Sequence, residues 1–252
     1  MEPLIAPRTD FSIEAINDDW IVVGKPAPLI VHPTNGREEI TLLGELKKRW
    51  PQDEFHFINR LDRETSGCVL VAKSKKAARF FGKLMMRRQI HKKYLAIVHG
   101  WPTWDEILVD RPLLRMGEIK ESSIWVRQMV HDSGKASVTR FELKRQFRRE
   151  GQQFAMVEAE PQTGRTHQIR VHLESLGHVI VGDKIYARNG EDYLEFIESG
   201  WNEELQKRSL LSRHALHSSM ISFQWEGKAF EVCCPLPGDL EEFSLGLGEK
   251  KD

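Results

Sequence analysis

The chain has 252 residues, 40% of them hydrophobic and 29% charged, which is ordinary for a globular protein and enough for one large domain. Lysine and arginine together number 37, as do aspartate and glutamate, so the net charge favours no class of partner. No apolar run approaches the roughly 20 residues of a membrane span. The N-terminus lacks the basic and apolar pattern of a secretory signal. We therefore expect a soluble cytoplasmic protein with no membrane partner.

The three cysteines also suit a reducing compartment. Cys68, Cys233 and Cys234 form an odd set with one adjacent pair, which is no disulfide framework. No C-x-x-C pair is present, which argues against a zinc ribbon. We expect reduced cysteines, as is usual in the cytoplasm.

The first part of the chain predicts short strands, a loop and a helix. Residues 19–31 read as a strand, a Gly-Lys-Pro turn and a second apolar run, and His32-Pro33 with Asn35-Gly36 marks a loop. Residues 41–50 predict a helix with Leu42, Leu43 and Leu46 on one side, ending at Pro51. Residues 68–72 are continuously apolar and predict a buried strand.

A basic amphipathic helix is predicted at residues 74–90. Ser74 suits its N-cap, and Ala77, Phe80, Phe81, Leu84 and Met85 recur at helical spacing. From Thr65 to Trp104 the chain has no aspartate or glutamate but nine lysines and arginines: Lys73, Lys75, Lys76, Arg79, Lys83, Arg87, Arg88, Lys92 and Lys93. Such a surface is typical either of a site that binds a polyanion or of a helix face that is simply exposed to water.

Later segments alternate between strand and helix patterns. Residues 94–98 predict a strand ending at Gly100, and residues 122–130 and 136–147 predict a hairpin around His131-Asp-Ser-Gly134. Residues 154–160 predict a strand, and residues 166–176 a helix capped by Thr166 and ended by Gly177. Residues 192–210 predict an amphipathic helical insertion, and residues 214–233 a final hairpin around Glu226-Gly227. The pattern predicts an α+β fold with a mostly antiparallel sheet.

The segment from Asn59 to Gly67 places four charges and two hydroxyls in a loop directly before the buried strand. Neighbouring cations would favour the ionised form of Asp62. An ionised carboxylate can attack an electrophilic sugar carbon or stabilise positive charge there. Taken alone, the same residues also suit a hydrogen-bonded turn whose charges satisfy one another.

The segment from Gly164 to Leu173 begins a predicted helix, whose free backbone N–H groups favour anions. Arg165 precedes the first turn, and its planar guanidinium suits a carboxylate or a phosphate. His167, Arg170 and His172 either line the same cleft or are ordinary structural residues. The histidine spacing is not that of a helical zinc site, so we predict no metal.

With these two motifs the chain closely resembles the RluA-type pseudouridine synthases. That family carries H-R-L-D-x-x-T-S-G, then K-x-Y, G-R-x-H-Q-I-R-x-H-L and G-D-x-x-Y. The order is maintained from about residue 13 to 240, through Arg60-Leu61-Asp62, Thr65-Ser66-Gly67, Lys92-Lys93-Tyr94, Gly164 to Leu173, and Gly182-Asp183 with Tyr186. Shorter matches are Lys25-Pro26, Val31-His32-Pro33, Ala215-Leu216-His217 and Pro235-Leu236-Pro237.

The resemblance implies isomerisation of uridine to pseudouridine in an rRNA or tRNA stem-loop, with no cofactor and no metal. Asp62 matches the catalytic aspartate, acting as nucleophile on the anomeric carbon or as base to form a glycal. Tyr94 matches the tyrosine that stacks on the flipped uracil, and Arg165 the arginine that pairs with the aspartate. Residues implied in substrate binding are Arg60, Arg63, Thr65, Lys92, Lys93, His167 and Arg170.

The implied architecture is the pseudouridine synthase fold, with a mixed, mainly antiparallel central sheet, flanking helices and a basic catalytic cleft. We expect a single catalytic domain over residues 1–252, with a lead of residues 1–12 in place of the N-terminal RNA-binding domain that many members carry. The insertion at about residues 190–210 is not a general family feature, and it either tunes RNA choice or covers an edge. We expect a monomer with no obligatory protein partner.

One departure lies beside the predicted catalytic residue. Asn59 stands where the family usually has histidine, and asparagine can donate and accept hydrogen bonds but cannot titrate near neutrality. We interpret it as a support for the loop.

Two competing hypotheses belong to other classes. The first is a non-catalytic RNA-binding protein on the same scaffold, against which the presence of Asp62, Tyr94 and Arg165 argues. The second is a hydrolase of a nucleoside or sugar bond, which lacks the second carboxylate that paired-carboxylate glycosidases need.

Overall fold

The computed structural model describes residues 5–33 and 40–245. The contacts divide the chain into two compact units, which are Met1–Lys93 with His217–Leu236 (unit 1) and Tyr94–Leu216 with Pro237–Asp252 (unit 2). The predicted loop at Asn35-Gly36 and the first part of the predicted lead lie outside the described residues. The expectation of one domain over the whole chain stays a prediction.

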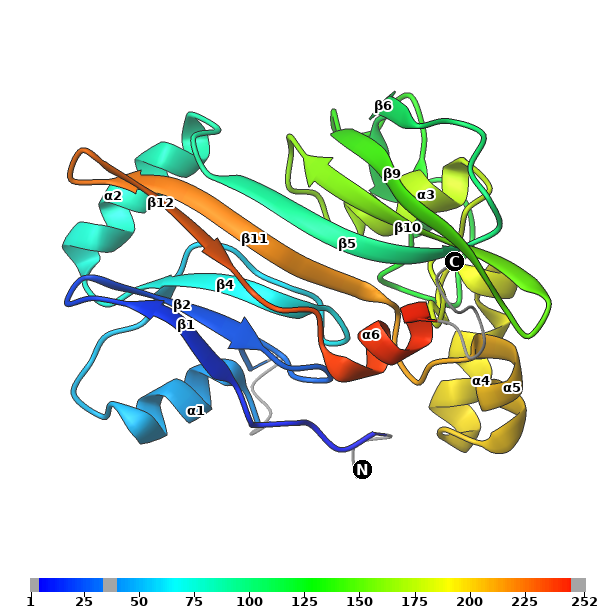
Figure 1. Cartoon of the computed structure of the whole chain (residues 1–252), viewed down its shortest axis with the longest axis horizontal. Coiled ribbons are helices and arrows are strands. Elements are labelled where there is room, and N and C mark those ends of the chain that lie inside the picture. Colours follow the sequence, from blue (N-terminus) through cyan, green and yellow to red (C-terminus); the bar gives the residue numbers. More distant parts are fainter. Residues whose placement is uncertain (1–4, 34–39, 246–252) are drawn as a thin grey trace, which may run out of the picture. The chain divides into compact units, whose positions relative to one another are not determined.

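Unit 1 is built on a sheet with strand order β1-β2-β4-β11, to which β3 adds beside β4 and β12 beside β11 (Figure 1). Neighbours run antiparallel, except that β4 and β11 run parallel. The elements are β1 (Ser12–Ile16), β2 (Trp20–Lys25), α1 (Leu42–Arg49), β3 (His56–Phe57), β4 (Ser66–Ala72), α2 (Lys75–Met86), β11 (Leu216–Trp225) and β12 (Lys228–Cys233).

The buried core of unit 1 explains why these segments fold as they do. Every residue of β2 and β4 is buried, and for β4 the continuous apolar run of residues 68–72 predicted this. Phe81 of α2 is fully buried and stacks on Trp225 of β11, with ring centroids 5.1 Å apart. The predicted apolar stripe of α2 is narrower than expected, because Phe80 and Met85 are each 36% exposed. Helix α1 buries Leu42 and Leu46 and begins at the capping residue Thr41.

Helix α2 begins as predicted, because the Ser74 hydroxyl accepts the N–H of Ala77 at 3.2 Å. Replacing Ser74 with alanine should lower the free energy of unfolding by about 1 kcal/mol, because this N–H loses its acceptor. Urea unfolding measures the effect. Thr166→Ala is the matched control and should leave stability almost unchanged, and equal losses in the two variants would contradict the assignment.

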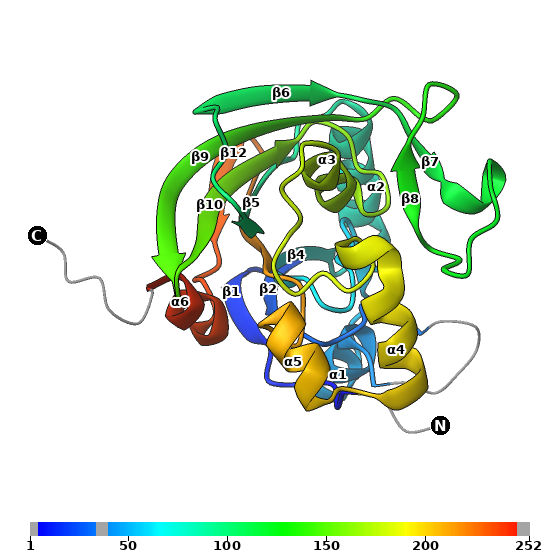
Figure 2. The same ribbon diagram turned by 90° about the vertical axis from the view of Figure 1, so that its right-hand side faces the viewer.

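Unit 2 contains a second antiparallel run of strands, in the order β5-β10-β9-β6, and a separate pair, β7-β8. Helix α3 lies against β8, β9 and β10 (Figure 2). The elements are β5 (His91–His99, its first residues in unit 1), β6 (Glu106–Asp110), β7 (Leu113–Arg115), β8 (Gln128–Val130), β9 (Val138–Arg149), β10 (Gln152–Pro161), α3 (Gln168–Ser175), α4 (Glu191–Ser199), α5 (Glu203–Ser209) and α6 (Gly238–Leu245), with 3-10 turns at Met116–Glu118 and Ala187–Gly190.

The predicted hairpin of residues 122–130 with 136–147 is wrong. The turn itself exists, since Gly134 N–H donates to the His131 carbonyl at 2.8 Å. After the turn, Lys135 exchanges two backbone hydrogen bonds with Leu113, which begins β7. Strand β8 therefore pairs with β7, whereas β9 pairs with β10 on one side and β6 on the other.

The predicted N-cap of α3 is also wrong, although its end is as predicted. His167, not Thr166, occupies the cap position, in the left-handed conformation and without a side-chain capping bond. At the other end Gly177 has φ +81°, and its N–H and that of His178 donate back to the carbonyls of Glu174 and Leu173. This is the Schellman arrangement that a terminal glycine predicts.

The predicted insertion at 192–210 is helical and consists of two helices. Helices α4 and α5 lie side by side, and Asn202 caps the second (Figure 2). Both units mix helices with mostly antiparallel strands, so the predicted α+β class is confirmed. Within the part of the chain that the structure describes, no helix has the length and apolar character to cross a membrane.

Candidate functional site

Asp62 lies half-buried in a tight turn between β3 and β4 of unit 1. Its backbone carbonyl accepts the N–H of Thr65 at 3.1 Å, and Thr65 is itself only 2% exposed. Arg60 and Arg63 are exposed on either side of Asp62, and the Arg63 guanidinium donates to the Ile5 carbonyl. The turn therefore holds Asp62 between two arginines that a ligand can reach.

Lys25, at the end of β2, holds this turn from inside the protein. Its side chain is 1% exposed, and its Nζ donates to the carbonyls of Pro26 at 2.9 Å, Leu29 at 2.7 Å and Arg63 at 3.2 Å. The same Arg63 carbonyl accepts the N–H of Leu29 at 2.9 Å. A buried ammonium group is stable only with such partners, so Lys25 both depends on the Asp62 turn and fixes it.

Replacing Lys25 with methionine should lower the free energy of unfolding by about 2–4 kcal/mol, because buried carbonyls lose charge-assisted hydrogen bonds. Methionine keeps much of the length and apolar contact of the lysine stem. Urea unfolding measures the loss. The control is Lys47→Met on the exposed side of α1, which should unfold like the wild type, and equal midpoints for the two variants would contradict the role of Lys25.

Asn59 closes the other end of the Asp62 loop. It is buried, its Nδ2 donates to the Cys68 carbonyl at 3.1 Å, and its Oδ1 accepts the N–H of Leu70 at 2.8 Å. Both bonds tie the start of the loop to β4. Asn59 thus supports the loop, as we interpreted from the sequence.

The Ser66-Gly67 end of the motif is determined by β11. The Ser66 hydroxyl and His217 Nδ1 lie 2.9 Å apart and are buried. Gly67 has φ +110°, and a Cβ there would lie 2.2 Å from the Ser218 carbonyl oxygen. Only glycine fits this close approach of two backbones, which explains the last residue of the motif.

The remaining predicted residues of unit 1 lie at the start of β5. Lys92 and Lys93 are half-buried, and burial lowers the pKa of Lys92. The Lys93 carbonyl accepts the Ser219 hydroxyl at 3.2 Å. His32 has its pKa lowered by burial and by the charge of Arg60, which favours its neutral form.

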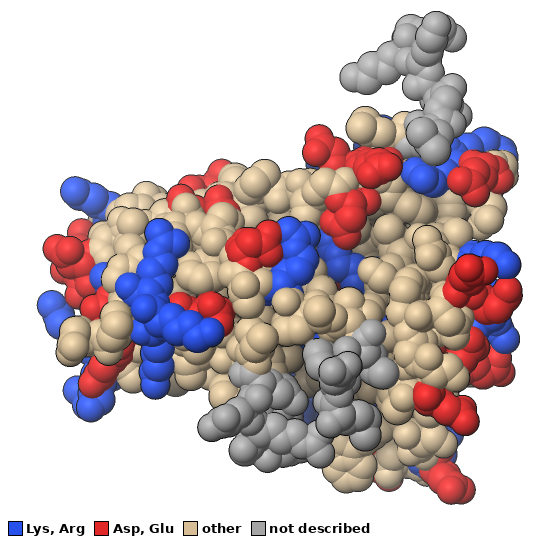
Figure 3. Space-filling view, turned by 90° about the horizontal axis from the view of Figure 1, so that it is seen from below, with Lys and Arg blue, Asp and Glu red and all other residues tan. Residues whose placement is uncertain are grey.

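Helix α2 presents its basic residues to solvent. Its apolar side is buried, and the exposed residues of this helix and its C-terminal end include Lys75, Lys76, Arg79, Lys83, Arg87 and Arg88. On the face shown in Figure 3, by contrast, lysine and arginine lie among aspartate and glutamate. The α2 segment thus carries a basic surface, whereas the face in Figure 3 mixes both signs of charge.

In unit 2, Arg165 is exposed directly before α3, and its turn is braced by Gln168. The buried Gln168 Oε1 accepts the Arg165 N–H at 3.0 Å, and Gln168 Nε2 donates to the Val138 carbonyl and the Thr139 hydroxyl of β9. The Arg165 Nε donates to the Ala136 carbonyl at 3.2 Å. Three bonds thus tie the Arg165 turn to β9 and the segment just before it.

His167 is held by Tyr186. The His167 Nδ1 lies 2.9 Å from the Tyr186 hydroxyl, which also accepts the N–H of Gln128 at 3.1 Å. His167 is half-buried, with φ +56°. Its ring is therefore fixed next to the Arg165 turn.

Arg170 is buried and makes a two-bond ion pair with Asp183, at 2.7 and 2.9 Å. His172 is likewise internal: it lies 2.9 Å from the Thr139 hydroxyl, and burial lowers its pKa. Burial, with the charges of Arg170 and other nearby cations, lowers the pKa of His214 well below its usual range. Arg170 and His172 therefore have structural partners, and the role of Arg170 in substrate binding stays a prediction.

The predicted residues thus form one group in each unit. Unit 1 gathers Arg60, Asp62, Arg63 and Thr65 in one turn and carries Lys92 and Lys93. Unit 2 carries Tyr94, which is 7% exposed, and gathers Arg165, His167 and Arg170 around the start of α3. Four further residues that hold these segments, Lys25, Gln168, Asp183 and Tyr186, had no role predicted from the sequence. All four stand at named positions of the family motifs, which was the available signal.

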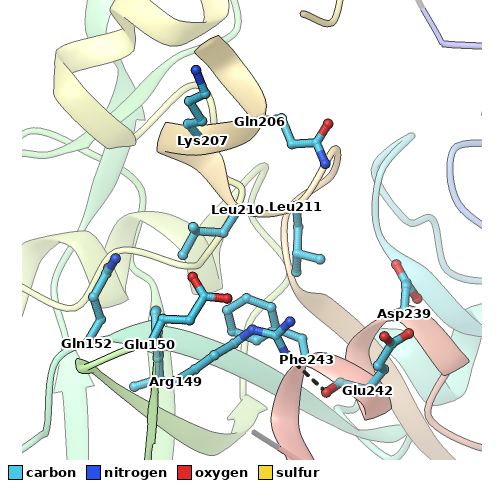
Figure 4. Close-up of a pocket in the computed structure, with 11 residues that line it drawn as sticks. Arg149, Glu150, Gln152, Gln206, Lys207, Leu210, Leu211, Asp239, Glu242 and Phe243 are labelled. Atoms are coloured by element: carbon cyan, nitrogen blue, oxygen red, sulfur yellow. Dashed lines mark hydrogen bonds between the residues drawn. The ribbon is translucent and has the colours of Figure 1, made fainter. Parts of the chain in front are cut away.

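A cavity of about 450 Å³ lies elsewhere in unit 2, among the β9–β10 turn, α5 and α6 (Figure 4). Phe154 and Phe243 line it, as do Arg149 and Glu242, and Arg149 donates to the Glu242 carbonyl. Both signs of charge line it, from Arg149 and Lys207 to Glu150, Asp239 and Glu242. None of the predicted site residues lines this cavity, and its charges do not select a polyanion.

A family model described as RNA pseudouridylate synthase matches residues 19–175, which is more than half of the chain. The chain belongs to this family. It is an RNA pseudouridine synthase of the RluA type, as the motifs predicted.

Named relatives agree with this assignment. Ribosomal large subunit pseudouridine synthase D of Xylella fastidiosa is 32% identical, over 95% of this chain and 71% of the relative. The enzyme of the same name from Vibrio cholerae is 31% identical, over 92% and 69%. The structure of human RNA Pseudouridylate Synthase Domain Containing 1 matches with a TM-score of 0.71 and 27% identity, over 93% of this chain and 86% of that one. The predicted pseudouridine synthase fold is therefore confirmed.

Proposed function

We propose that this pseudouridine synthase isomerises a specific uridine of ribosomal RNA, with Asp62 as its catalytic carboxylate. The observation that carries the role of Asp62 is its turn. A half-buried carboxylate lies between two exposed arginines, on a loop held by Lys25 and Asn59. The RNA class is supported by relatives named as synthases of the ribosomal large subunit. A tRNA substrate is the alternative.

The chemistry that we assign to Asp62 takes place at the sugar. The carboxylate attacks the anomeric carbon, or removes a proton to form a glycal, and the glycosidic bond breaks. The freed uracil turns, and its carbon 5 bonds to the anomeric carbon as the bond between Asp62 and the sugar breaks or, on the glycal route, as the sugar takes back its proton from Asp62. Tyr94 stacks on the uracil and is the candidate to remove the proton from carbon 5, while Arg165 pairs with the carboxylate. Isomerisation of this kind consumes no redox equivalent, so we propose no cofactor.

The target base must leave its stack before these groups can act on it, at a cost of a few kcal/mol. We assign Arg60 to the gap that the base leaves, because this arginine is exposed beside Asp62. The further candidates for substrate binding are Arg63, Thr65, Lys92, Lys93 and His167. Arg170 is buried and paired with Asp183, so we propose that it contributes by supporting the start of α3. We assign the exposed lysines and arginines of the α2 segment to contacts with RNA phosphates. Replacing one of these cations would reduce the salt dependence of RNA binding.

We further propose that the enzyme works in the cytoplasm as a monomer, in one catalytic domain with a basic cleft, and without an obligatory protein partner. The free cysteines of the described structure, Cys68, Cys233 and Cys234, are consistent with a reducing compartment.

Pseudouridine mapping of total RNA tests the proposed function. Cells with and without the gene are compared, and the deletion is complemented with the wild type or with Asp62→Ala. We expect one or a few rRNA pseudouridines to disappear and to return only with the wild type. Loss confined to tRNA would establish the alternative substrate, and an unchanged map would overturn the proposal.

A further inference from the structure

Trp125 is the most exposed tryptophan of the described residues, with 75% of its surface accessible. It lies in unit 2 between the 3-10 turn Met116–Glu118 and β8. An indole buries 150–250 Å² when it packs, so leaving one in water forgoes a large hydrophobic gain. We therefore ask what this ring could bind.

The neighbours of Trp125 are anchored, so its exposure is not the result of a loose loop. Ile124 is 4% exposed and packs with Leu113, Val171 and Tyr186. Gly190 makes room for it, since a Cβ at this glycine would lie 2.4 Å from the Ile124 Cδ1 atom.

On the other side of Trp125, Arg127 is 7% exposed and its guanidinium donates to the Asn189 carbonyl. Two backbone hydrogen bonds hold the segment that carries Trp125. Met116 N–H donates to the Arg127 carbonyl, and Arg127 N–H donates to the Ile124 carbonyl. Trp125 and Val126 are thus exposed between two anchored, buried residues, Ile124 and Arg127.

One face of the indole carries a planar cation. The guanidinium carbon of Arg115, on β7, lies 3.6 Å from the centre of the Trp125 ring. This stack orients the ring before any ligand binds, which reduces the entropy lost on binding. With 75% of the residue accessible, room remains on the ring for a second planar group.

We propose that Trp125 is a stacking platform for an unpaired nucleobase of the RNA, outside the nucleotide that reacts. The inference rests on the proposed function, which supplies an RNA with unstacked bases. Bases of single-stranded segments stack on aromatic side chains and arginine planes, and phosphates beside them favour cations such as Arg115 and the exposed Lys120.

The platform is also connected to the predicted site residues of its own unit. Gln128 begins β8, three residues after Trp125, and its N–H donates to Tyr186, whose hydroxyl contacts His167. A base held by Trp125 would therefore be placed relative to the Arg165 turn through a short chain of hydrogen bonds.

Binding of a fluorescein-labelled 12-nucleotide oligouridylate, followed by anisotropy, tests the platform without any need for turnover. Stacking contributes about 1–3 kcal/mol per base, so Trp125→Ala should raise Kd roughly 5- to 150-fold. Trp125→Phe should retain most of the affinity. The dependence of Kd on salt should be unchanged in both variants, because no phosphate contact is removed.

Ile119→Ser is the matched control, since Ile119 is a 49% exposed apolar residue of the same connection. It should bind the oligonucleotide like the wild type, and all three variants should keep the thermal unfolding midpoint of the wild type. Wild-type Kd in Trp125→Ala, or equal losses in Trp125→Ala and Ile119→Ser, would overturn the platform and point to a protein-binding surface. Failure of the proposed function looks different: pseudouridines in the cell would be unchanged while Trp125 still contributed to RNA binding.

Discussion

Replacing Asp62 with asparagine should lower the rate of pseudouridine formation at least roughly 1,000-fold, the scale expected when the group that takes part in bond cleavage is lost. Asparagine has nearly the same shape but no negative charge, so it can neither attack the sugar nor accept its proton. The turn should survive, because the hydrogen bonds accepted by the backbone carbonyls of Asp62 and Arg63 are kept in this variant. Single-turnover assays on RNA from the deletion strain measure the effect.

The control for this variant is Glu64→Gln, which removes a carboxylate two residues away in the same loop. It should keep most of the wild-type rate, and Asp62→Asn should bind RNA with wild-type affinity. A rate near wild type in Asp62→Asn would mean that Asp62 is only a turn residue, as its local chemistry alone also allows. Equal losses in both variants would point to the general charge of the loop.

The largest effect on stability is expected from Asp183→Ala, which should lower the free energy of unfolding by about 3–5 kcal/mol. The side chains of Arg170 and Asp183 are only 5% and 1% exposed, so alanine would leave a buried guanidinium without its counter-ion. Asp183 Oδ1 also accepts the N–H groups of Ile185 and Tyr186, at 3.1 and 3.2 Å. The variant therefore loses an ion pair and a turn together.

Urea unfolding of Glu106→Ala gives the matched comparison. Glu106 makes the same two-bond contact with Arg140, at 2.5 and 2.7 Å, but the side chains are 54% and 33% exposed. An exposed pair contributes about 0–1 kcal/mol, because water replaces the lost partner. A loss in Asp183→Ala no larger than in Glu106→Ala would contradict a structural role for the buried pair.

Predictions from local sequence patterns were correct where the contacts that determine the structure lie within the same segment. The apolar run at residues 68–72 became the buried strand β4, and Ser74 and Gly177 marked helix ends because their contacts lie within a few residues. The final hairpin around Glu226-Gly227 was correct for the same reason. The residues of the Asp62 loop alone also suit a structural turn, and the prediction of a catalytic role for Asp62 came from the family motifs.

Predictions failed where the outcome depended on distant partners. Residues 122–130 and 136–147 alternate between polar and apolar residues like a hairpin, but this alternation does not identify the strand with which each will pair. In the structure Lys135 forms backbone hydrogen bonds with Leu113 instead. Thr166 has the chemistry of an N-cap, yet Gln168 takes up the Arg165 N–H, and His167 adopts the left-handed cap position beside Tyr186. A single segment does not encode these contacts.

The α+β class, the family and the candidate residues Asp62, Tyr94 and Arg165 could be predicted from the amino-acid sequence, because motif order and hydrophobic period are properties of the chain. The contacts that hold the two site segments are seen only in the folded structure. Lys25 lies under the Asp62 turn, and Asp183 clamps Arg170 in the helix that follows the Arg165 turn. A buried lysine or arginine is stable only when distant backbone or side-chain oxygens satisfy it, and those partners are brought to it by folding.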